Sequence, residues 1–294
     1  MSRKAGAAIA AGCTVVIKPP AETPFTVNAI VKLGHQAGIP KGVLNVTPAM
    51  DNTIEVVRTL TSSPLVHKVS FTGSTNVGKI LMRQCAETTL KKVCLELGGN
   101  APFIVFNDAD IDAAVAGAIA CKFRGSGQTC VSANRIYVQD DIYDRFSEKL
   151  ASVVRESLVV GNSLETTTVT QGPLINSSAV RKAKEHVEDA VSKGARVLVG
   201  GDRLPQLGPN FFQPTVLVEM SKNMKLATEE TFGPVCGLFR FRTESEVIDL
   251  ANDTEMGLAA YLFSKEIHRA WRVARALRVG MVGYTGIISD VAAA

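Results

Sequence analysis

Two side chains in this sequence have types and neighbours suited to covalent catalysis. Cys130 ends the stretch Gly125–Cys130, where glycines on both sides of a serine form a mobile loop that permits close approach, so the thiol could act as a nucleophile. Glu96 ends an apolar stretch, where a carboxylate is costly to bury unless it is paired or acts as a general base. Each also has a structural explanation, since a cysteine is commonly a small buried apolar residue and the glutamate can lie just outside the core.

Lys18 and the turn at Gly73 and Ser74 are candidates for binding an anionic ligand. Lys18 follows the apolar stretch Val15–Ile17, and α/β sheets bind ligands at the carboxyl ends of their strands. Gly73 and Ser74 separate a strand-like stretch from a helical one, and a helix N-terminus offers unpaired N–H groups to an anion. The turn is no G-x-G-x-x-G fingerprint, and a solvated lysine or an ordinary turn explains each feature taken alone.

Apolar strand-like stretches alternate with helical ones along almost the whole sequence. Before Gly98 we expect strands at 14–17, 43–46, 67–71 and 92–95, and helices at 24–36, 53–60 and 76–86. After Gly98 and Gly99, our candidate domain boundary, we expect strands at 103–106, 135–138, 196–199, 235–241, 259–264 and 279–282. The helices expected there are 143–158, 179–192, 247–252, 267–277 and one capped by Asp110 that runs to about Phe123. Strands this apolar predict a parallel sheet covered by helices.

Composition excludes several classes of protein. The 294 residues are 46% hydrophobic with a net charge of +4, which excludes general disorder, and no apolar stretch reaches the roughly 18–20 residues of a membrane helix. Basic residues are not clustered and histidines lack metal-ligand spacing, so we expect no nucleic-acid partner, no membrane partner and no metal. Six cysteines without a Cys-x-x-Cys pair indicate a reducing compartment, the cytoplasm or alternatively the mitochondrial matrix. The cysteines expected to be small buried apolar residues are Cys13, Cys85, Cys94 and Cys236.

Taken together, the motifs resemble those of the aldehyde dehydrogenase superfamily. The stretches Leu95–Asn100, Gly127–Cys130, Phe71–Ser74 and Glu229–Pro234 match family motifs in the family's order, and the resemblance covers essentially the whole chain. It implies an α/β fold with part of a Rossmann-type cofactor domain at residues 1–98 and an α/β catalytic domain at residues 99–294. Within the superfamily the sequence is most similar to the succinate-semialdehyde dehydrogenases, which implies NAD(P)-dependent oxidation of succinate semialdehyde to succinate.

The resemblance also implies a role for each motif residue. Cys130 would attack the aldehyde carbon, and Glu96 would activate the water that hydrolyses the thioester. The residues implied in binding NAD or NADP are Lys18, Ala21, Gly73, Ser74, Leu97, Glu230 and Phe232. Those implied in holding the substrate carboxylate are Arg3, Arg124 and Ser289, since arginine binds a carboxylate with two parallel hydrogen bonds.

Departures from the family pattern leave alternatives open. Members that use only NAD place a glutamate where this sequence has Ala21, so NADP becomes plausible. The family's asparagine that completes the oxyanion hole is absent, as are stretches at both ends of the family's chain. We therefore expect a segment of a longer, homo-oligomeric protein that by itself turns over slowly, because one missing oxyanion donor costs on the order of 10²–10³ in rate. Oxidation of another aldehyde, such as glutarate semialdehyde, and a catalytically incomplete nucleotide-binding segment remain the alternatives.

Overall fold

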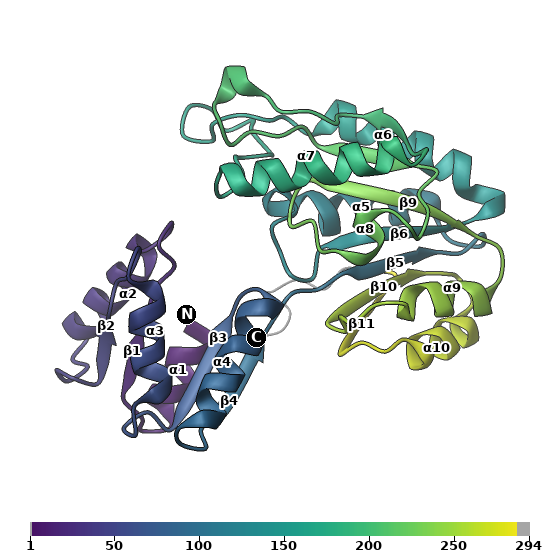
Figure 1. Ribbon diagram of the computed structural model, residues 1–294. Coiled ribbons are helices and arrows are strands. Elements are labelled where there is room, and N and C mark those ends of the chain that lie inside the picture. Colours follow the sequence, from purple (N-terminus) through teal and green to yellow (C-terminus); the bar gives the residue numbers. More distant parts are fainter. Residues whose placement is uncertain (1, 287–294) are drawn as a thin grey trace. The chain divides into compact units, whose positions relative to one another are not determined.

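The computed structural model describes residues 2–286 and divides into two compact units, Met1–Leu97 and Gly98 onward. Both units are built from alternating strands and helices, as Figure 1 shows in the sequence colours. The chain is thus an α/β protein, as the sequence predicts.

The first unit contains two small parallel sheets. Its strands are β1 (Val15–Ile17), β2 (Leu44–Val46), β3 (Lys68–Thr72) and β4 (Lys92–Glu96). Its helices are α1 (Ser2–Ala10), α2 (Phe25–Gln36), α3 (Thr53–Ser62) and α4 (Thr75–Glu87). Strand β1 pairs with β2, and β3 pairs with β4. The buried apolar cluster is small and consists of Ala5, Val27, Val31 and Leu44.

The strands of the first unit are less buried than the sequence predicts. In β3 and β4 every second residue is exposed, because successive side chains point to opposite faces and one face of this two-stranded sheet is open among the described residues. Cys94 lies on that open face and Cys13 lies in the turn after α1. The expectation that these two cysteines are buried is therefore wrong, whereas Cys85 and Cys236 are buried as expected.

The second unit is organised around one seven-stranded sheet. Its strands are β5 (Ala101–Val105), β6 (Ala133–Gln139), β7 (Arg196–Val199), β8 (Thr215–Val218), β9 (Val235–Phe241), β10 (Ala259–Phe263) and β11 (Met281–Tyr284), in the order β11-β10-β5-β6-β9-β8-β7. All neighbours are parallel except β7 and β8, which are antiparallel. The prediction of a wholly parallel sheet is thus wrong at this edge, where no helix longer than a single turn separates β7 from β8.

Helices cover both faces of this sheet. One face packs against α5 (Ile111–Phe123) and α6 (Tyr143–Ser157). The other packs against α7 (Ser177–Ser192), α9 (Glu244–Asn252) and α10 (Ile267–Ala276), with the short helix α8 (Lys225–Thr228) preceding β9. Every residue of β5 and β10 is buried, and the rings of Phe103 and Phe263 stack at a centroid distance of 4.9 Å. The exposed side of α10 carries Trp271, which is 65% exposed.

Capping residues explain where the helices of the second unit begin. Asp110 caps α5 as predicted, with its carboxylate accepting from the backbone N–H groups of Asp112 and Ala113 at 2.9 and 3.1 Å. Thr243 and Glu246 form a capping box, so α9 begins at Glu244 rather than at the predicted Val247. No helix within residues 2–286 is long and apolar enough to cross a membrane.

Candidate active site

The carboxyl ends of β1 and β2 border a cavity of about 460 Å³ in the first unit. Parallel pairing brings both strand ends to one edge, which is where α/β sheets bind ligands. The lining residues are Pro19, Pro20, Ala21, Pro24, Pro48, Ala49, Met50, Asp51 and Asn52. Lys18, half-buried, leaves β1 immediately before this lining begins. The structure therefore places Ala21 in the wall of a cavity of a size that a nucleoside could enter.

The carboxyl ends of β3 and β4 bring other predicted residues together. The Gly73 N–H donates to the Glu96 carbonyl at 3.1 Å, so the turn after β3 lies beside the end of β4. Ser74 caps α4 by accepting from the Val77 N–H at 3.4 Å. Leu97 packs on Gly78 in the first turns of α4, where a side chain would collide with it. This edge thus offers an anion the N-terminus of a 13-residue helix.

Glu96 lies at the surface of the first unit. Its side chain is exposed, because it occupies the open face of the β3–β4 sheet together with Cys94. This exposure agrees with the structural explanation, a glutamate just outside the core, and the role of general base stays a prediction. Arg3, also in the first unit, is an exposed residue of α1, and the neighbouring Lys4 Nζ donates to Thr72 Oγ1 at 2.6 Å.

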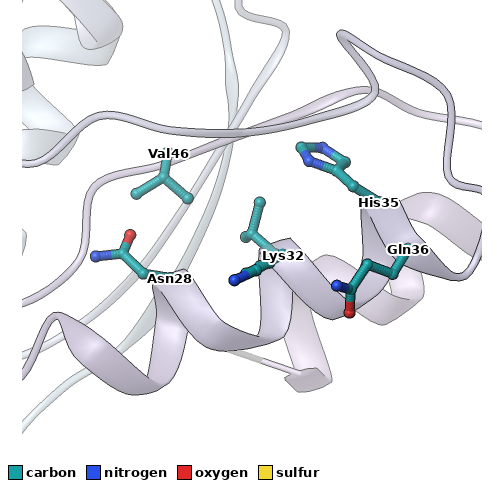
Figure 2. A pocket seen from close by; sticks show the side chains of 6 residues that line it. Asn28, Lys32, His35, Gln36 and Val46 are labelled. Atoms are coloured by element: carbon teal, nitrogen blue, oxygen red, sulfur yellow. The ribbon is translucent and has the colours of Figure 1, made fainter.

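A second cavity of about 470 Å³ lies along α2 and contains no predicted site residue. Figure 2 shows its polar lining by Asn28, Lys32, His35 and Gln36 from α2, with Val46 from β2. His35 Nε2 lies 3.1 Å from the Leu44 carbonyl oxygen, which fixes the ring against β2. The described contacts explain this histidine structurally.

In the second unit, Cys130 lies on a tight loop between α5 and β6. The helix ends at Phe123, and the exposed Arg124 begins a tight turn, Arg124–Gly127. Cys130 itself is half-buried, and its carbonyl oxygen would lie 2.2 Å from a Cβ at residue 99. Only glycine can therefore occupy position 99, where the backbone packs directly on that of Cys130.

Glu230 meets the same glycine from a second loop. The Gly99 N–H donates to Glu230 Oε1 at 3.1 Å, and burial raises the pKa of Glu230 despite this hydrogen bond. Phe232 follows with φ = +52° and a side chain that is 38% exposed. Glu230, Gly99 and Cys130 thus form one cluster, with an uncovered aromatic ring two residues away in the sequence.

His186 lies beside the loop that carries Glu230, and the sequence predicts no role for it. It is 1% exposed on α7, with Nδ1 3.0 Å from Thr231 Oγ1 and Nε2 3.4 Å from Glu229 Oε2. Burial lowers its pKa, and Lys182 adds to this effect while Glu229 opposes it. The histidine is thus hydrogen-bonded to Thr231 and lies beside Glu229, the two sequence neighbours of Glu230. Its place on the apolar stripe Val180–Ala183–Val187–Ala190 is the signal that could have revealed it.

Lys122 is a second buried titratable residue for which the sequence predicts no role. Its Nζ is fully buried at the end of α5 and donates to Asn134 Oδ1 at 2.8 Å. Burial lowers the pKa of Lys122 to about 8. The Lys122 carbonyl oxygen also accepts from Ser132 Oγ at 3.4 Å, two residues after Cys130. A lysine at the end of an otherwise apolar helix was the available signal.

The predicted site residues thus divide between the two units, except for Ser289. The first unit holds Lys18, Ala21, Gly73, Ser74, Glu96, Leu97 and Arg3, and the second holds Arg124, Cys130, Glu230 and Phe232. Ser289 lies outside the described residues. Among residues 2–286 no cluster of three or more His, Cys, Asp or Glu side chains could hold a metal ion.

Comparison with known proteins identifies the family of this chain. The profile "Aldehyde dehydrogenase family" matches residues 1–292. A glutarate-semialdehyde dehydrogenase of Pseudomonas putida is 57% identical over 99% of this chain and 59% of its own length. A succinate-semialdehyde dehydrogenase [NADP(+)] of Schizosaccharomyces pombe is 56% identical over 99% of this chain and 58% of its own.

Solved structures give the same result for the fold. The crystal structure of an Escherichia coli NADP-dependent enzyme superposes with a TM-score of 0.95 at 55% identity, and covers 98% of this chain and 59% of that one. The chain therefore spans somewhat under three fifths of the length of these relatives. With the family motifs in order and the fold shared, the chain belongs to the aldehyde dehydrogenase family.

Proposed function

We propose that the protein containing this chain is an NADP-dependent aldehyde dehydrogenase that oxidises succinate semialdehyde to succinate. The observation that carries the proposal is the placement of Cys130 on a tight loop that begins at the exposed Arg124 and packs on Gly99 beside Glu230. A nucleophile, a group for the substrate carboxylate and a coenzyme-binding carboxylate then belong to one local arrangement.

Cys130 performs the covalent steps of the proposed reaction. Its thiolate forms a bond to the aldehyde carbon, and the carbonyl oxygen becomes the oxyanion of a thiohemiacetal. A bound nicotinamide coenzyme would supply the hydride acceptor, so that loss of hydride from this carbon would leave a thioester on Cys130. Glu96 takes a proton from water, whose oxygen attacks the thioester and releases succinate and the thiol.

The first unit supplies most of the proposed coenzyme site. The cavity walled by Ala21 suits the adenosine end, with Lys18 and Glu230 for the two riboses. The N-terminus of α4 at Gly73 and Ser74 suits the pyrophosphate, next to Leu97. An alanine at position 21 carries no charge that would repel a 2′-phosphate, which favours NADP. The Schizosaccharomyces pombe relative and the Escherichia coli structure bear NADP in their names. We place Phe232 against the nicotinamide.

The second unit supplies the proposed group for the substrate carboxylate. Arg124 is exposed and makes no ion pair with residues 2–286, so its guanidinium can pair with an acid remote from the aldehyde. Arg3 and Ser289 are proposed to assist. Glutarate semialdehyde is the second candidate substrate, because it carries the same two groups one methylene further apart and the Pseudomonas relative is named for it. Assembly into a homo-oligomer and a cytoplasmic or mitochondrial location remain predictions.

Selective alkylation of Cys130 tests the proposed nucleophile directly. The chain is prepared with the exposed Cys13 and Cys94 changed to serine, treated with limiting iodoacetamide and mapped by peptide mass spectrometry. We expect Cys130 to be labelled first, because burial raises the pKa values of Cys121 and Cys236. Earlier labelling of Cys121 or Cys236 would contradict the proposal.

Turnover tests the reaction and the substrate class. NADPH formation is measured with succinate semialdehyde, glutarate semialdehyde and butanal, for the wild-type chain and for Cys130→Ala. Any activity should favour the two acidic aldehydes and should vanish in Cys130→Ala. Activity that survives this substitution overturns the mechanism, and a preference for butanal overturns the substrate class.

A further inference from the structure

The loop before Cys130 contains three consecutive residues in the left-handed region. Gly125, Ser126 and Gly127 have φ values of 59°, 57° and 71°. Glycine adopts this conformation readily, whereas a residue with a Cβ does so at a cost, so Ser126 is strained. Such residues persist where the surrounding structure holds them, and they concentrate at functional sites.

A hydrogen bond explains how the strained serine is held. Ser126 is 3% exposed, and its Oγ donates to the Gly172 carbonyl oxygen at 2.9 Å. Gly172 belongs to the segment between α6 and α7, 46 residues further along the chain. The serine side chain therefore links the loop to a distant segment of the same unit.

Two further contacts hold the loop against its neighbours. Gln128 Nε2 donates to the Gly125 carbonyl at 3.2 Å, and Gln128 Oε1 accepts from the Ile175 N–H at 2.8 Å. Gly127 faces the Gly233 carbonyl oxygen so closely that a Cβ would lie 2.2 Å from it. The loop that the sequence suggests to be mobile is thus fastened on two sides, and Ser126 provides a fastening that a glycine could not.

We propose that Ser126 is a positioning residue for Cys130. The Ser126 hydroxyl fixes the left-handed turn by its hydrogen bond to the Gly172 carbonyl oxygen. The inference rests on the proposed function in taking Cys130 as the nucleophile. Three residues lie between Ser126 and Cys130, and the carbonyl of Cys130 is already fixed against Gly99. Loss of the hydroxyl therefore frees the loop at its start, which exposes the half-buried thiol and removes its alignment.

Two substitutions of Ser126 separate the hydrogen bond from the strain, and a third substitution serves as a control. Ser126→Ala removes the hydroxyl and keeps the strained backbone, whereas Ser126→Gly removes both. Ser147→Ala is the matched control, because it removes another buried serine hydroxyl, bonded to the Tyr143 carbonyl within α6. All three are made in the chain that lacks Cys13 and Cys94.

The rate of Cys130 alkylation is the readout, because it requires no turnover. One hydrogen bond of ordinary strength shifts a local opening equilibrium about fivefold, so labelling of Cys130 should accelerate about fivefold in both Ser126 variants and stay unchanged in Ser147→Ala. Labelling of the buried Cys236 should stay slow in all of them, which shows that the unit remains folded. The melting temperature of Ser126→Gly should stay within about 3 °C of the parent, because relief of strain offsets the lost bond.

The outcomes distinguish this inference from the proposed function. Unchanged Cys130 labelling in Ser126→Gly overturns the positioning role, and so does acceleration in Ser126→Ala alone, which would assign the effect to strain. If Ser126→Ala fails to fold, Ser126→Gly carries the test, since glycine accepts the φ of this position. Dehydrogenase activity that survives Cys130→Ala would sink the proposed nucleophile and leave the labelling result standing.

Discussion

The two units use the same kinds of elements and differ in how completely those elements are covered. In the second unit, helices pack on both faces of the sheet and the strands β5 and β10 are wholly buried. In the first unit, β3 and β4 alternate between half-buried and exposed residues. Its large exposed apolar side chains include Phe25, Leu33, Met50, Ile54, Leu65 and Leu90. Burial of apolar surface is the dominant stabilising contribution, so the second unit should be stable where the first opens readily.

This difference separates two kinds of functional residue. The proposed nucleophile and its positioning contacts lie in the well-packed unit, whereas most proposed coenzyme residues lie in the sparsely packed one. Geometry at a reacting atom must be held closely, and a rigid support provides this. A two-stranded sheet is marginally stable alone, so the coenzyme residues depend on whatever else stabilises the first unit.

Phe103→Ala should have the largest effect and would show that the second unit has the stronger core. The ring is fully buried against Phe263, and replacing a buried phenylalanine by alanine costs about 3–5 kcal/mol of unfolding free energy. Urea denaturation should show this loss in the second unit, while amide hydrogen exchange of the first unit is unchanged. Leu65→Ala, at an exposed leucine of the first unit, should change stability by less than about 0.5 kcal/mol. Equal losses would remove the contrast.

Lys122 should make the second unit more stable at alkaline pH. Its folded pKa of about 8 lies below the ordinary 10.5, so the unfolded chain binds more protons between these values and stability rises with pH. The gain across this window is about 3 kcal/mol. Burial raises the pKa values of Tyr143 and Cys236 to about 12, and these groups act in the opposite direction above their ordinary values.

Comparison with Lys122→Met isolates the contribution of the lysine. Urea denaturation at about pH 8 and about pH 10 should give a smaller rise for this variant than for the wild type. Lys222→Met, at an exposed lysine, is the matched control and should leave the rise intact. An identical rise in Lys122→Met would show that this amine does not titrate in the window.

Arg124→Ala, a change in the second unit, should lower kcat/KM for the acidic substrate. Loss of a charge-assisted hydrogen bond costs about 1.5–3 kcal/mol, or about 10–100-fold in kcat/KM for succinate semialdehyde. Turnover of butanal and the affinity for NADP should change little. Arg196→Ala, at an exposed arginine of β7, serves as the control. Equal losses on both aldehydes would exclude the carboxylate role.

Ala21→Glu should have the smallest effect, confined to the coenzyme side in the first unit. A carboxylate in the wall of the cavity would accept from a ribose 2′-OH and repel a 2′-phosphate, so the ratio of NADP to NAD affinity should fall about tenfold. Coenzyme titrations measure the ratio, with Thr59→Glu on the exposed side of α3 as a charge-matched control. An unchanged ratio would place coenzyme selection elsewhere.

Local patterns predict most elements of the fold and miss what depends on distant partners. Asp110 marks the start of α5 because a cap acts within one turn. The expected strands omit β8, four residues that follow a proline, and no local pattern shows that it runs antiparallel to β7. The exposure of Cys94 is equally non-local, because it depends on whether anything covers one face of β4.

The candidate site follows the same division. Cys130 and Glu96 are proposed from their types and from the motifs that contain them, and Glu230 from the family motif alone, so all three remain predictions. The contact of Ser126 with Gly172 joins segments 46 residues apart, and that of His186 with Thr231 joins segments 45 apart. Only folding brings these partners together, so spacing in the sequence carries no sign of them.

The position of Trp271 decides what optical spectroscopy can report about this protein. It is the single tryptophan of the sequence and lies on α10 of the second unit. Its indole fluorescence therefore reports the surroundings of one helix of the second unit. Because the ring is already largely exposed to water, the wavelength of its emission maximum should shift little when the second unit unfolds. Collisional quenching by a small solute or a probe attached to Cys94 would report more than intrinsic emission does.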